Sequence, residues 1–167
     1  GKLEGHTIAF VGDLKYGRTV HSLVKALTHF GAKLYFVAPE TLQMPKYILE
    51  DLDSLGIEYT LLNDYREIMG EIDVFYMTRI QRERFPDDEE YEKVKGVYIL
   101  NKEDVVGKAK EEMIILHPLP RVNEIAVNLD DTKHALYFKQ AANGVPVRQA
   151  LLSLALGYKA KLQEGDK

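Results

Sequence analysis

The amino-acid sequence predicts an α/β fold: a three-layer, Rossmann-like, doubly wound arrangement. A mostly parallel sheet of about five strands would carry helices on both faces. Short apolar runs alternate along the chain with segments of helical period, which is typical of parallel sheets with crossover helices. The 167 residues are 46% hydrophobic and 29% charged, and this size and composition suit one globular domain. We expect that domain over residues 1–157 and a polar tail over residues 158–167.

Five runs rich in apolar and β-branched residues are expected to form the sheet. Each run is followed within two residues by glycine, proline or a polar side chain, which ends the strand. The predicted strands cover residues 7–11, 33–37, 57–62, 73–78 and 113–116.

The segments between these strands carry helix signals. Pro45 suits a helix start because its missing N–H is not needed there, and Gly56 suits a helix end. Asp64 can cap a short helix, whereas Asn143 and Gly144 are expected to separate the last two helices. The predicted helices cover residues 19–30, 45–55, 64–68, 89–95, 103–108, 134–142 and 146–156. Around the fourth of these, residues 80–95 are dense in charge, and we interpret them as a mobile excursion.

Composition argues against several functions. Lys plus Arg number 22 and Asp plus Glu number 26, giving a net charge of -4, so no basic surface is expected for nucleic acid. No apolar run reaches the roughly 20 residues of a membrane span, and the first residues lack the apolar core of a signal peptide. The absence of cysteine excludes disulfides, cysteine-ligated zinc and thiol catalysis. We expect a cytoplasmic protein with no metal, cofactor, nucleic-acid or membrane partner.

The chain is organised around residues 12–21, where an apolar strand ends at Gly12 and a helical pattern begins at Thr19. The short loop between them carries Lys15 and Arg18. Ligands of open α/β sheets bind beyond the carboxyl ends of the strands, and helix N-termini favour anions. This turn therefore predicts an anion site.

Two further predicted strands are also followed by positive charge, at Arg79 and Arg121. Strand ends of a parallel sheet gather at one edge, so we expect these cations near Arg18. The planar guanidinium can hold a carboxylate or phosphate through two parallel hydrogen bonds. A small anionic molecule is the predicted ligand.

Residues 12–19 nearly match the phosphate-binding pattern G-x-x-x-x-G-K-[ST]. Arg18 replaces the lysine, and Asp13 would oppose the charge of a triphosphate. The fourth predicted strand ends in Met77 and Thr78 rather than in an acidic ligand for Mg²⁺. A nucleotide triphosphatase is therefore the least favoured alternative, and the dinucleotide fingerprint G-x-G-x-x-G is absent.

Residues 117–121 read His-Pro-Leu-Pro-Arg and follow the fifth predicted strand. The two prolines restrict Leu119 and remove two backbone donors, which leaves an acceptor-rich loop. From the residues alone, such a loop either receives an ammonium group through its carbonyls or is a stiff connector. We also expect a cis peptide bond between Leu119 and Pro120.

Five motifs together carry a resemblance: GDLKYGRTVHS (12–22), YMTRIQRER (76–84), HPLPRVNEI (117–125), YFKQAANG (137–144) and RQALL (148–152). In this order they resemble the catalytic chains of the aspartate carbamoyltransferase family. The resemblance covers only the second half of such a chain, its aspartate-binding domain. Ornithine carbamoyltransferases fit less well, because their amine-binding loop typically reads His-Cys-Leu-Pro where this chain has Pro118. The second amino group of ornithine would also require an acidic side chain as its partner.

The resemblance implies roles for individual residues. Arg18 would hold the α-carboxylate of L-aspartate, and Arg79 and Gln81 would hold its side-chain carboxylate. The backbone carbonyls of Leu119 and Pro120 would orient its attacking amine. Residues implied in supporting the site or closing its loop are Asp13, Lys15, Tyr16, Arg84, Glu90 and Tyr91.

The resemblance also implies a reaction: transfer of the carbamoyl group of carbamoyl phosphate to L-aspartate, giving N-carbamoyl-L-aspartate and phosphate in pyrimidine biosynthesis. In the family, carbamoyl phosphate binds a preceding domain that has no counterpart here, so this chain alone is expected to be inactive. The implied partners are L-aspartate, carbamoyl phosphate through that domain, a homotrimer of complete catalytic chains and possible regulatory chains. A non-catalytic binding or assembly module is the alternative from another class.

The last predicted helix, residues 146–157, is apolar over more than one face. In the family this helix packs on the first domain. We therefore expect it either to self-associate or to be disordered in this chain.

Overall fold

A computed structural model describes residues 4–157, and the tail predicted for residues 158–167 lies outside them. The described chain forms a parallel sheet with the strand order β3-β2-β1-β4-β5. The predicted α/β fold with a sheet of five strands is thereby confirmed, and each predicted strand overlaps an observed one. The strands are β1 (Thr7–Val11), β2 (Lys33–Val37), β3 (Tyr59–Leu62), β4 (Val74–Met77) and β5 (Ile114–Leu116).

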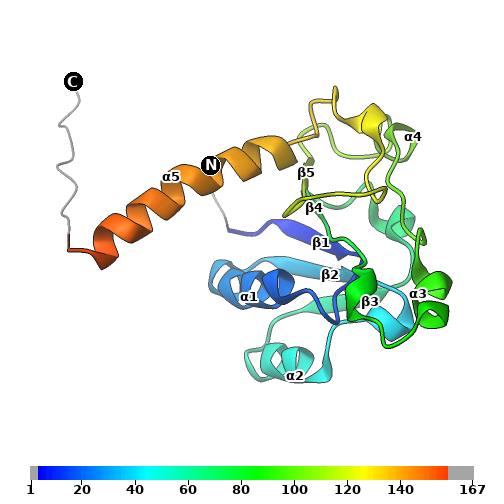
Figure 1. The fold of residues 1–167 in the computed structure, drawn as a ribbon, viewed down its shortest axis with the longest axis horizontal. Helices are drawn as coiled ribbons and strands as arrows, with labels where there is room; N and C mark the ends of the chain where they lie inside the picture. Colours follow the sequence, from blue (N-terminus) through cyan, green and yellow to red (C-terminus); the bar gives the residue numbers. More distant parts are fainter. Residues whose placement is uncertain (1–3, 158–167) are drawn as a thin grey trace.

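Helices cover both faces of the sheet and divide the core into two parts (Figure 1). Successive side chains of β1 point to opposite faces, so Phe10 packs in one part of the core and Val11 in the other. The first part is completed by α1, α2 and α3, and the second by α4 and the start of α5. The helices are α1 (Arg18–Leu27), α2 (Lys46–Ser54), α3 (Asp88–Val94), α4 (Lys102–Val105) and α5 (Tyr137–Ala155).

Several predicted helix ends are replaced by tighter turns. The end of the segment predicted at 19–30 is a 3₁₀ turn, Thr28–Phe30, and the segment predicted at 64–68 is a 3₁₀ turn, Tyr65–Ile68. The predicted cap is confirmed, since the Asp64 carboxylate accepts the backbone N–H of Arg66. Helix α4 ends at Val105, three residues earlier than predicted, because the chain turns at Gly107 with φ 79°.

The prediction of two separate C-terminal helices is wrong, because one helix, α5, runs through both Gly144 and Pro146. A glycine in a helix costs only about 1 kcal/mol relative to alanine. Pro146 cannot donate to the carbonyl of Ala142, but Ala142 is exposed, so water can take that place.

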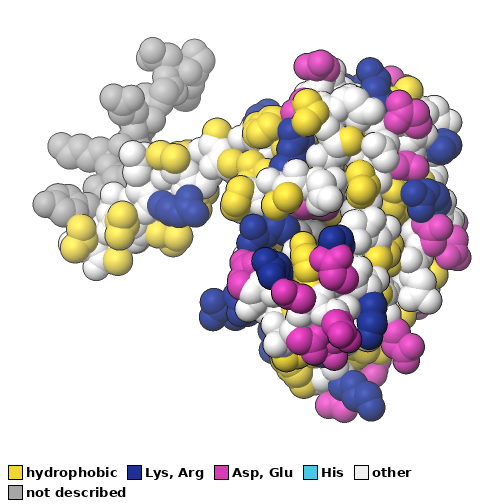
Figure 2. Space-filling model, turned by 45° about the vertical axis from the view of Figure 1, so that its right-hand side comes forward, with side chains coloured by type: hydrophobic (Ala, Val, Ile, Leu, Met, Phe, Trp, Pro, Cys, Tyr) yellow, Lys and Arg dark blue, Asp and Glu magenta, His cyan; other side chains and the backbone are white. Residues whose placement is uncertain are grey.

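The second half of α5 projects away from the sheet (Figure 1). Its apolar side chains are mostly open to solvent, as the yellow atoms along the projecting helix show (Figure 2). Leu151 is 61% exposed and Leu154 is 70% exposed. No helix among residues 4–157 is long and apolar enough to cross a membrane.

Candidate functional site

The strand order reverses between β1 and β4, and the loops that follow these two strands lie against each other. Gly12, directly after β1, has φ +116°, and a Cβ atom there would lie 2.4 Å from the carbonyl oxygen of Thr78. The Thr78 hydroxyl donates to the carbonyl of Val11 at 3.1 Å. Glycine at position 12 thus allows the two loops to meet at the switch point, where open α/β sheets bind ligands.

A hollow of about 200 Å³ opens at this point, between the loops after β1, β4 and β5 and the start of α1. Sites for drug-sized ligands are roughly 300–1,000 Å³, so this hollow suits a smaller molecule. It brings together all five predicted ligand-binding residues and three of the supporting ones. They are Arg18, Arg79, Gln81, Leu119 and Pro120, with Asp13, Tyr16 and Arg84.

Three arginines line the hollow, and two of them, Arg18 and Arg79, come from the start of α1 and from the loop after β4. Arg18 is the first residue of α1 and is exposed, and its guanidinium has no ion-pair partner among the described residues. Arg79 follows β4 and donates to the carboxylate of Glu83 at 2.8 Å. Arg18 therefore offers an unpaired cation, whereas Arg79 would share its guanidinium between Glu83 and a ligand.

Arg84 orients the side chain of Gln81. The Nε of Arg84 donates to the carboxamide oxygen of Gln81 at 3.0 Å. Since that oxygen is occupied, the carboxamide NH₂ group is the part of Gln81 left to donate to a ligand. The Gln81 amide and Arg79 can therefore both offer N–H donors to an anion in the hollow.

The expectation that Arg121 joins this cluster is wrong. Its guanidinium makes two hydrogen bonds to the carboxylate of Asp130, at 2.5 and 2.6 Å, and lies over the rings of Tyr137 and Phe138. The hydrogen bonds from Arg121 lower the pKa of Asp130. The Arg121 charge therefore stabilises the loop before α5 instead of a ligand.

Three other predicted residues lie outside the hollow. The side chains of Lys15 and Glu90 are exposed, and the ammonium of Lys15 lies 5.2 Å from the ring centroid of Tyr16. Tyr91 is linked to the site indirectly, because the ring of Phe85 makes edge contacts with both Tyr16 and Tyr91. These aromatic contacts join the loop after β1 to the charged excursion, residues 80–95.

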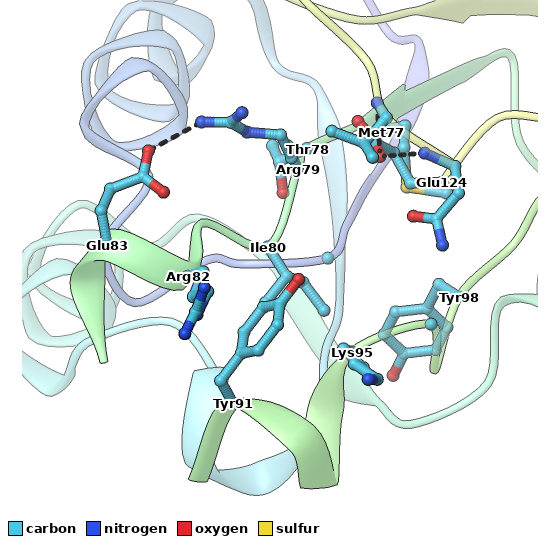
Figure 3. A pocket seen from close by; sticks show the side chains of 14 residues that line it. Met77, Thr78, Arg79, Ile80, Arg82, Glu83, Tyr91, Lys95, Tyr98 and Glu124 are labelled. Atoms are coloured by element: carbon cyan, nitrogen blue, oxygen red, sulfur yellow. Dashed lines mark hydrogen bonds and ion pairs between the residues drawn. The ribbon is translucent and has the colours of Figure 1, made fainter. Parts of the chain in front are cut away.

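Tyr91 lines a second hollow (Figure 3). Thr78 and Arg79 line both hollows. In this view the Arg79 guanidinium points toward Glu83, while Tyr91 and Lys95 rise from the excursion. The cations of this second hollow are paired, Arg82 with Asp88 and Lys95 with Glu92.

The predicted cis peptide bond between Leu119 and Pro120 is confirmed. Leu119 also has φ 55°, the left-handed region that side chains other than glycine rarely adopt. Its backbone N–H donates to Nδ1 of His117 at 2.7 Å. The acceptor-rich segment 118–120 therefore lines the hollow in a conformation fixed from within the chain.

A buried pair behind this segment was not predicted. His117 is 1% exposed, and its Nε2 lies 2.8 Å from the carboxylate of Glu124. Burial raises the pKa of Glu124, but hydrogen bonds from His117 and from backbone N–H groups outweigh it and leave the pKa lowered. Sequence spacing gives no signal for this pair, because the intervening loop is irregular.

Asp13 is the buried carboxyl of the hollow, 2% exposed. Burial raises its pKa even though its carboxylate accepts the backbone N–H of Tyr16 at 2.9 Å. The same loop explains why a triphosphate is not the ligand. Backbone N–H groups of Leu14 and Lys15 both donate to the carbonyl of Leu42, so they are not turned toward a phosphate. Among residues 4–157 no three His, Asp or Glu residues are grouped to hold a metal ion.

The fold and the hollow define a class: a doubly wound α/β domain with arginines lining a small hollow at its switch point. The family model "Aspartate/ornithine carbamoyltransferase, Asp/Orn binding domain" matches residues 4–155. The chain therefore belongs to the family of aspartate/ornithine carbamoyltransferase Asp/Orn-binding domains.

Relatives and solved structures agree with this membership. The chain is 56% identical over 155 residues to the aspartate carbamoyltransferase catalytic subunit of Brachyspira hyodysenteriae, covering 93% of this chain and 43% of that one. For the subunit of Thermococcus kodakarensis the identity is 55% over 157 residues, with coverage of 94% and 50%. This chain spans about half the length of these curated relatives.

The catalytic subunit of M. jannaschii aspartate transcarbamoylase superposes with a TM-score of 0.86 at 51% identity, covering 95% of this chain and 52% of that chain. The Trypanosoma cruzi enzyme, in complex with aspartate and phosphate, gives a TM-score of 0.80 at 38% identity, with coverage of 91% and 48%. Both matches therefore extend over nearly all of this chain and about half of the solved one.

Proposed function

We propose that this chain is the aspartate-binding half of an aspartate carbamoyltransferase. The complete enzyme would transfer the carbamoyl group of carbamoyl phosphate to the amine of L-aspartate. The observation that carries the proposal is the lining of the hollow: Arg18 from the start of α1 and Arg79 from the loop after β4 line it together with an acceptor-rich segment, residues 118–120. L-aspartate has the matching groups, two carboxylates and one amine.

In this proposal each carboxylate of L-aspartate meets its own guanidinium. Arg18 holds the α-carboxylate, and Arg79 with the Gln81 amide holds the side-chain carboxylate. Two planar forks at different positions fix the orientation of the substrate as well as its affinity. Glu83 and Arg84 support these ligand-binding groups. The Glu83 carboxylate accepts a hydrogen bond from Arg79, and Arg84 donates one to Gln81.

The amine is the nucleophile of the reaction. Backbone carbonyls of Leu119 and Pro120 accept hydrogen bonds from its N–H groups. Because the hydrogens are held there, the nitrogen lone pair is directed away from the segment and toward the carbamoyl carbon. The contribution of this chain to catalysis is thus orientation of the nucleophile.

The other half of the reaction belongs to a second domain in this proposal. Carbamoyl phosphate needs donors for its phosphate and for the carbonyl oxygen that becomes negative in the transition state. That domain would also cover the exposed apolar side chains in the second half of α5. Assembly into homotrimers, association with regulatory chains and a cytoplasmic location are further parts of the proposal, and they rest on the resemblance.

An ornithine carbamoyltransferase is disfavoured because ornithine carries a second cation. The acid that lines the hollow, Asp13, is buried and already accepts a backbone N–H. Two arginines beside it would repel an ammonium group.

The test supplies the carbamoyl-phosphate domain of a relative, fused or separate, and measures product formation. With carbamoyl phosphate and L-aspartate we expect carbamoyl-aspartate, and with ornithine we expect no citrulline. Citrulline formation would favour the ornithine alternative. No product from either amine, in a complex shown to assemble, would favour a non-catalytic module.

A further inference from the structure

The segment Pro118–Pro120 contains a single backbone N–H group, that of Leu119, because both its neighbours are prolines. This N–H donates to Nδ1 of His117 at 2.7 Å. All three residues line the hollow. The backbone of this segment can therefore offer a ligand carbonyl oxygens but no free N–H donor.

The same hydrogen bond determines the protonation of His117. A backbone N–H can only donate, so Nδ1 carries the lone pair and the ring proton resides on Nε2. Nε2 then donates to the Glu124 carboxylate at 2.8 Å. The other oxygen of Glu124 accepts the N–H groups of Val122 and Asn123, each at 3.1 Å (Figure 3).

The ring of His117 has no freedom to release Leu119. It is 1% exposed, and both its nitrogens are bonded. Its backbone N–H also donates to the side chain of Gln140 on α5 at 2.9 Å. Among the described residues, the groups that hold His117 thus come from the loop after β5 and from α5.

We propose that His117 makes this wall of the hollow selective for an amine, by withdrawing the Leu119 N–H from the ligand. The inference rests on the proposed function, in which the ligand is L-aspartate. A carboxylate placed against residues 118–120 would meet only acceptors, so it must turn to Arg18 or Arg79. His117 is accordingly a positioning residue that acts through Leu119 and decides which end of the ligand faces the wall.

Two substitutions separate the two hydrogen bonds of the ring. In His117→Asn the side-chain oxygen can replace Nδ1 as acceptor for Leu119, while the bond to Glu124 is lost. In His117→Gln the amide can reach Glu124 in place of Nε2, while the acceptor for Leu119 is lost. The two variants are therefore matched opposites.

The probes are L-aspartate and succinate, which is the same dicarboxylate without the amine. Affinities are measured by calorimetry on the complete two-domain chain. We expect the wild type to bind aspartate more tightly than succinate. His117→Asn should keep the ratio of the two affinities within about twofold of the wild-type ratio. His117→Gln should lower this ratio roughly tenfold, which is the size of effect expected for loss of a hydrogen bond to a charged group.

Thermal unfolding of the same variants distinguishes positioning from structure. His117→Asn leaves one oxygen of the buried Glu124 carboxylate without its donor, so it should unfold at a lower temperature than His117→Gln. We thus expect His117→Asn to lose more stability and His117→Gln to lose more selectivity. A ratio that falls more in His117→Asn, or stays unchanged in His117→Gln, would overturn the inference.

His134 supplies the control, because it is buried, bonds the carbonyl of Met113 at 2.6 Å and lies outside the hollow. His134→Gln should change stability without changing the ratio of affinities. If His117→Gln does not fold, an ester in place of the Leu119 amide removes the N–H itself, and the ratio should persist. Loss of the ratio in the ester would show that the ligand uses this N–H and would overturn the inference.

The wild type separates failure of this inference from failure of the proposed function. Equal affinities for aspartate and succinate would overturn only the role of residues 118–120. Absence of binding by either dicarboxylate would overturn the proposed function and this inference with it.

Discussion

Asp13 shows how a single residue of the hollow lowers the stability of the domain. Its carboxyl is buried, and burial raises its pKa. Between the ordinary carboxyl pKa of about 4 and the raised value, the folded state binds more protons than the unfolded state, so stability falls as pH rises through this window. This loss of folding stability persists at neutral pH.

We therefore predict that Asp13→Asn raises the free energy of unfolding at pH 7. The asparagine oxygen can still accept the Tyr16 N–H, but no charge is buried. The gain should vanish below about pH 4, where the wild-type carboxyl is protonated in both states. Urea unfolding at pH 7 and at pH 3.5 measures both values.

Asp130→Asn is the control of opposite sign. Hydrogen bonds from Arg121 lower the pKa of Asp130, so its contribution to stability is present above about pH 4 and is lost as pH falls through the lowered value. This variant should be less stable than the wild type at pH 7. Equal effects of the two substitutions at pH 7 would contradict both assignments.

Arg18 is an unpaired cation of the hollow among the described residues, and its removal should affect the substrate directly. Arg18→Ala removes a two-pronged, charge-assisted contact worth roughly 1.5–3 kcal/mol. In the complete enzyme this corresponds to a roughly 10- to 150-fold loss in kcat/KM for aspartate. Lys25→Ala on the same helix, which removes an exposed ion pair with Asp51, should leave kcat/KM unchanged. Wild-type kinetics in Arg18→Ala would refute the role.

At the scale of elements, α5 joins the site to a surface that the described domain does not bury. Its first turn carries Gln140, which bonds the backbone of His117, and its second half projects into solvent. Gly144 and Pro146 lie between the two halves. The helix is weakest where it leaves the domain.

We predict that Pro146→Ala strengthens the second half of α5. Proline costs about 3 kcal/mol relative to alanine inside a helix, so amide hydrogen exchange of residues 147–155 should slow by roughly 100-fold. The free energy of global unfolding should change little, because these residues are mostly exposed. Lys139→Ala, at an exposed site in the first turn, is the control. Unchanged exchange in Pro146→Ala would mean that the proline does not limit this segment.

At the scale of the whole molecule, the proposed function makes this chain one wall of a larger site. It spans about half the length of its curated relatives, and the residues that line its hollow include the ones that we assign to aspartate binding. Ordering a small ligand in an open hollow costs entropy, and a small number of contacts offsets only part of that cost.

We therefore predict weak aspartate binding by the 167-residue chain alone. The dissociation constant should lie in the millimolar range or above, and addition of the carbamoyl-phosphate domain with its substrate should lower it. Calorimetry with and without that domain makes the comparison. Micromolar affinity of the chain alone would contradict the prediction.

Much of this protein was predictable from local sequence. The apolar runs marked all five strands, and parallel strands bring their carboxyl ends to one edge. That rule alone was enough to place Arg18, Arg79 and Leu119 around one hollow. The proline at position 120 likewise made its cis peptide bond predictable, because cis peptides occur almost only before proline.

The tertiary structure decided what depends on partners distant in the sequence or separated by irregular loops. The sequence indicates that Arg121 is another ligand-binding cation, but in the structure Asp130 binds its guanidinium. The sequence indicates no role for His117 beyond its loop, but in the structure Glu124 fixes its ring. Local signals also predicted a break in α5, but the helix runs through Gly144 and Pro146, because the exposed carbonyl that lacks the Pro146 donor can bond water. Sequence periodicity determined the elements and the edge where they meet. Packing decided how each charge is used, because Asp130 holds both prongs of the Arg121 guanidinium, whereas no acidic side chain among the described residues pairs with Arg18.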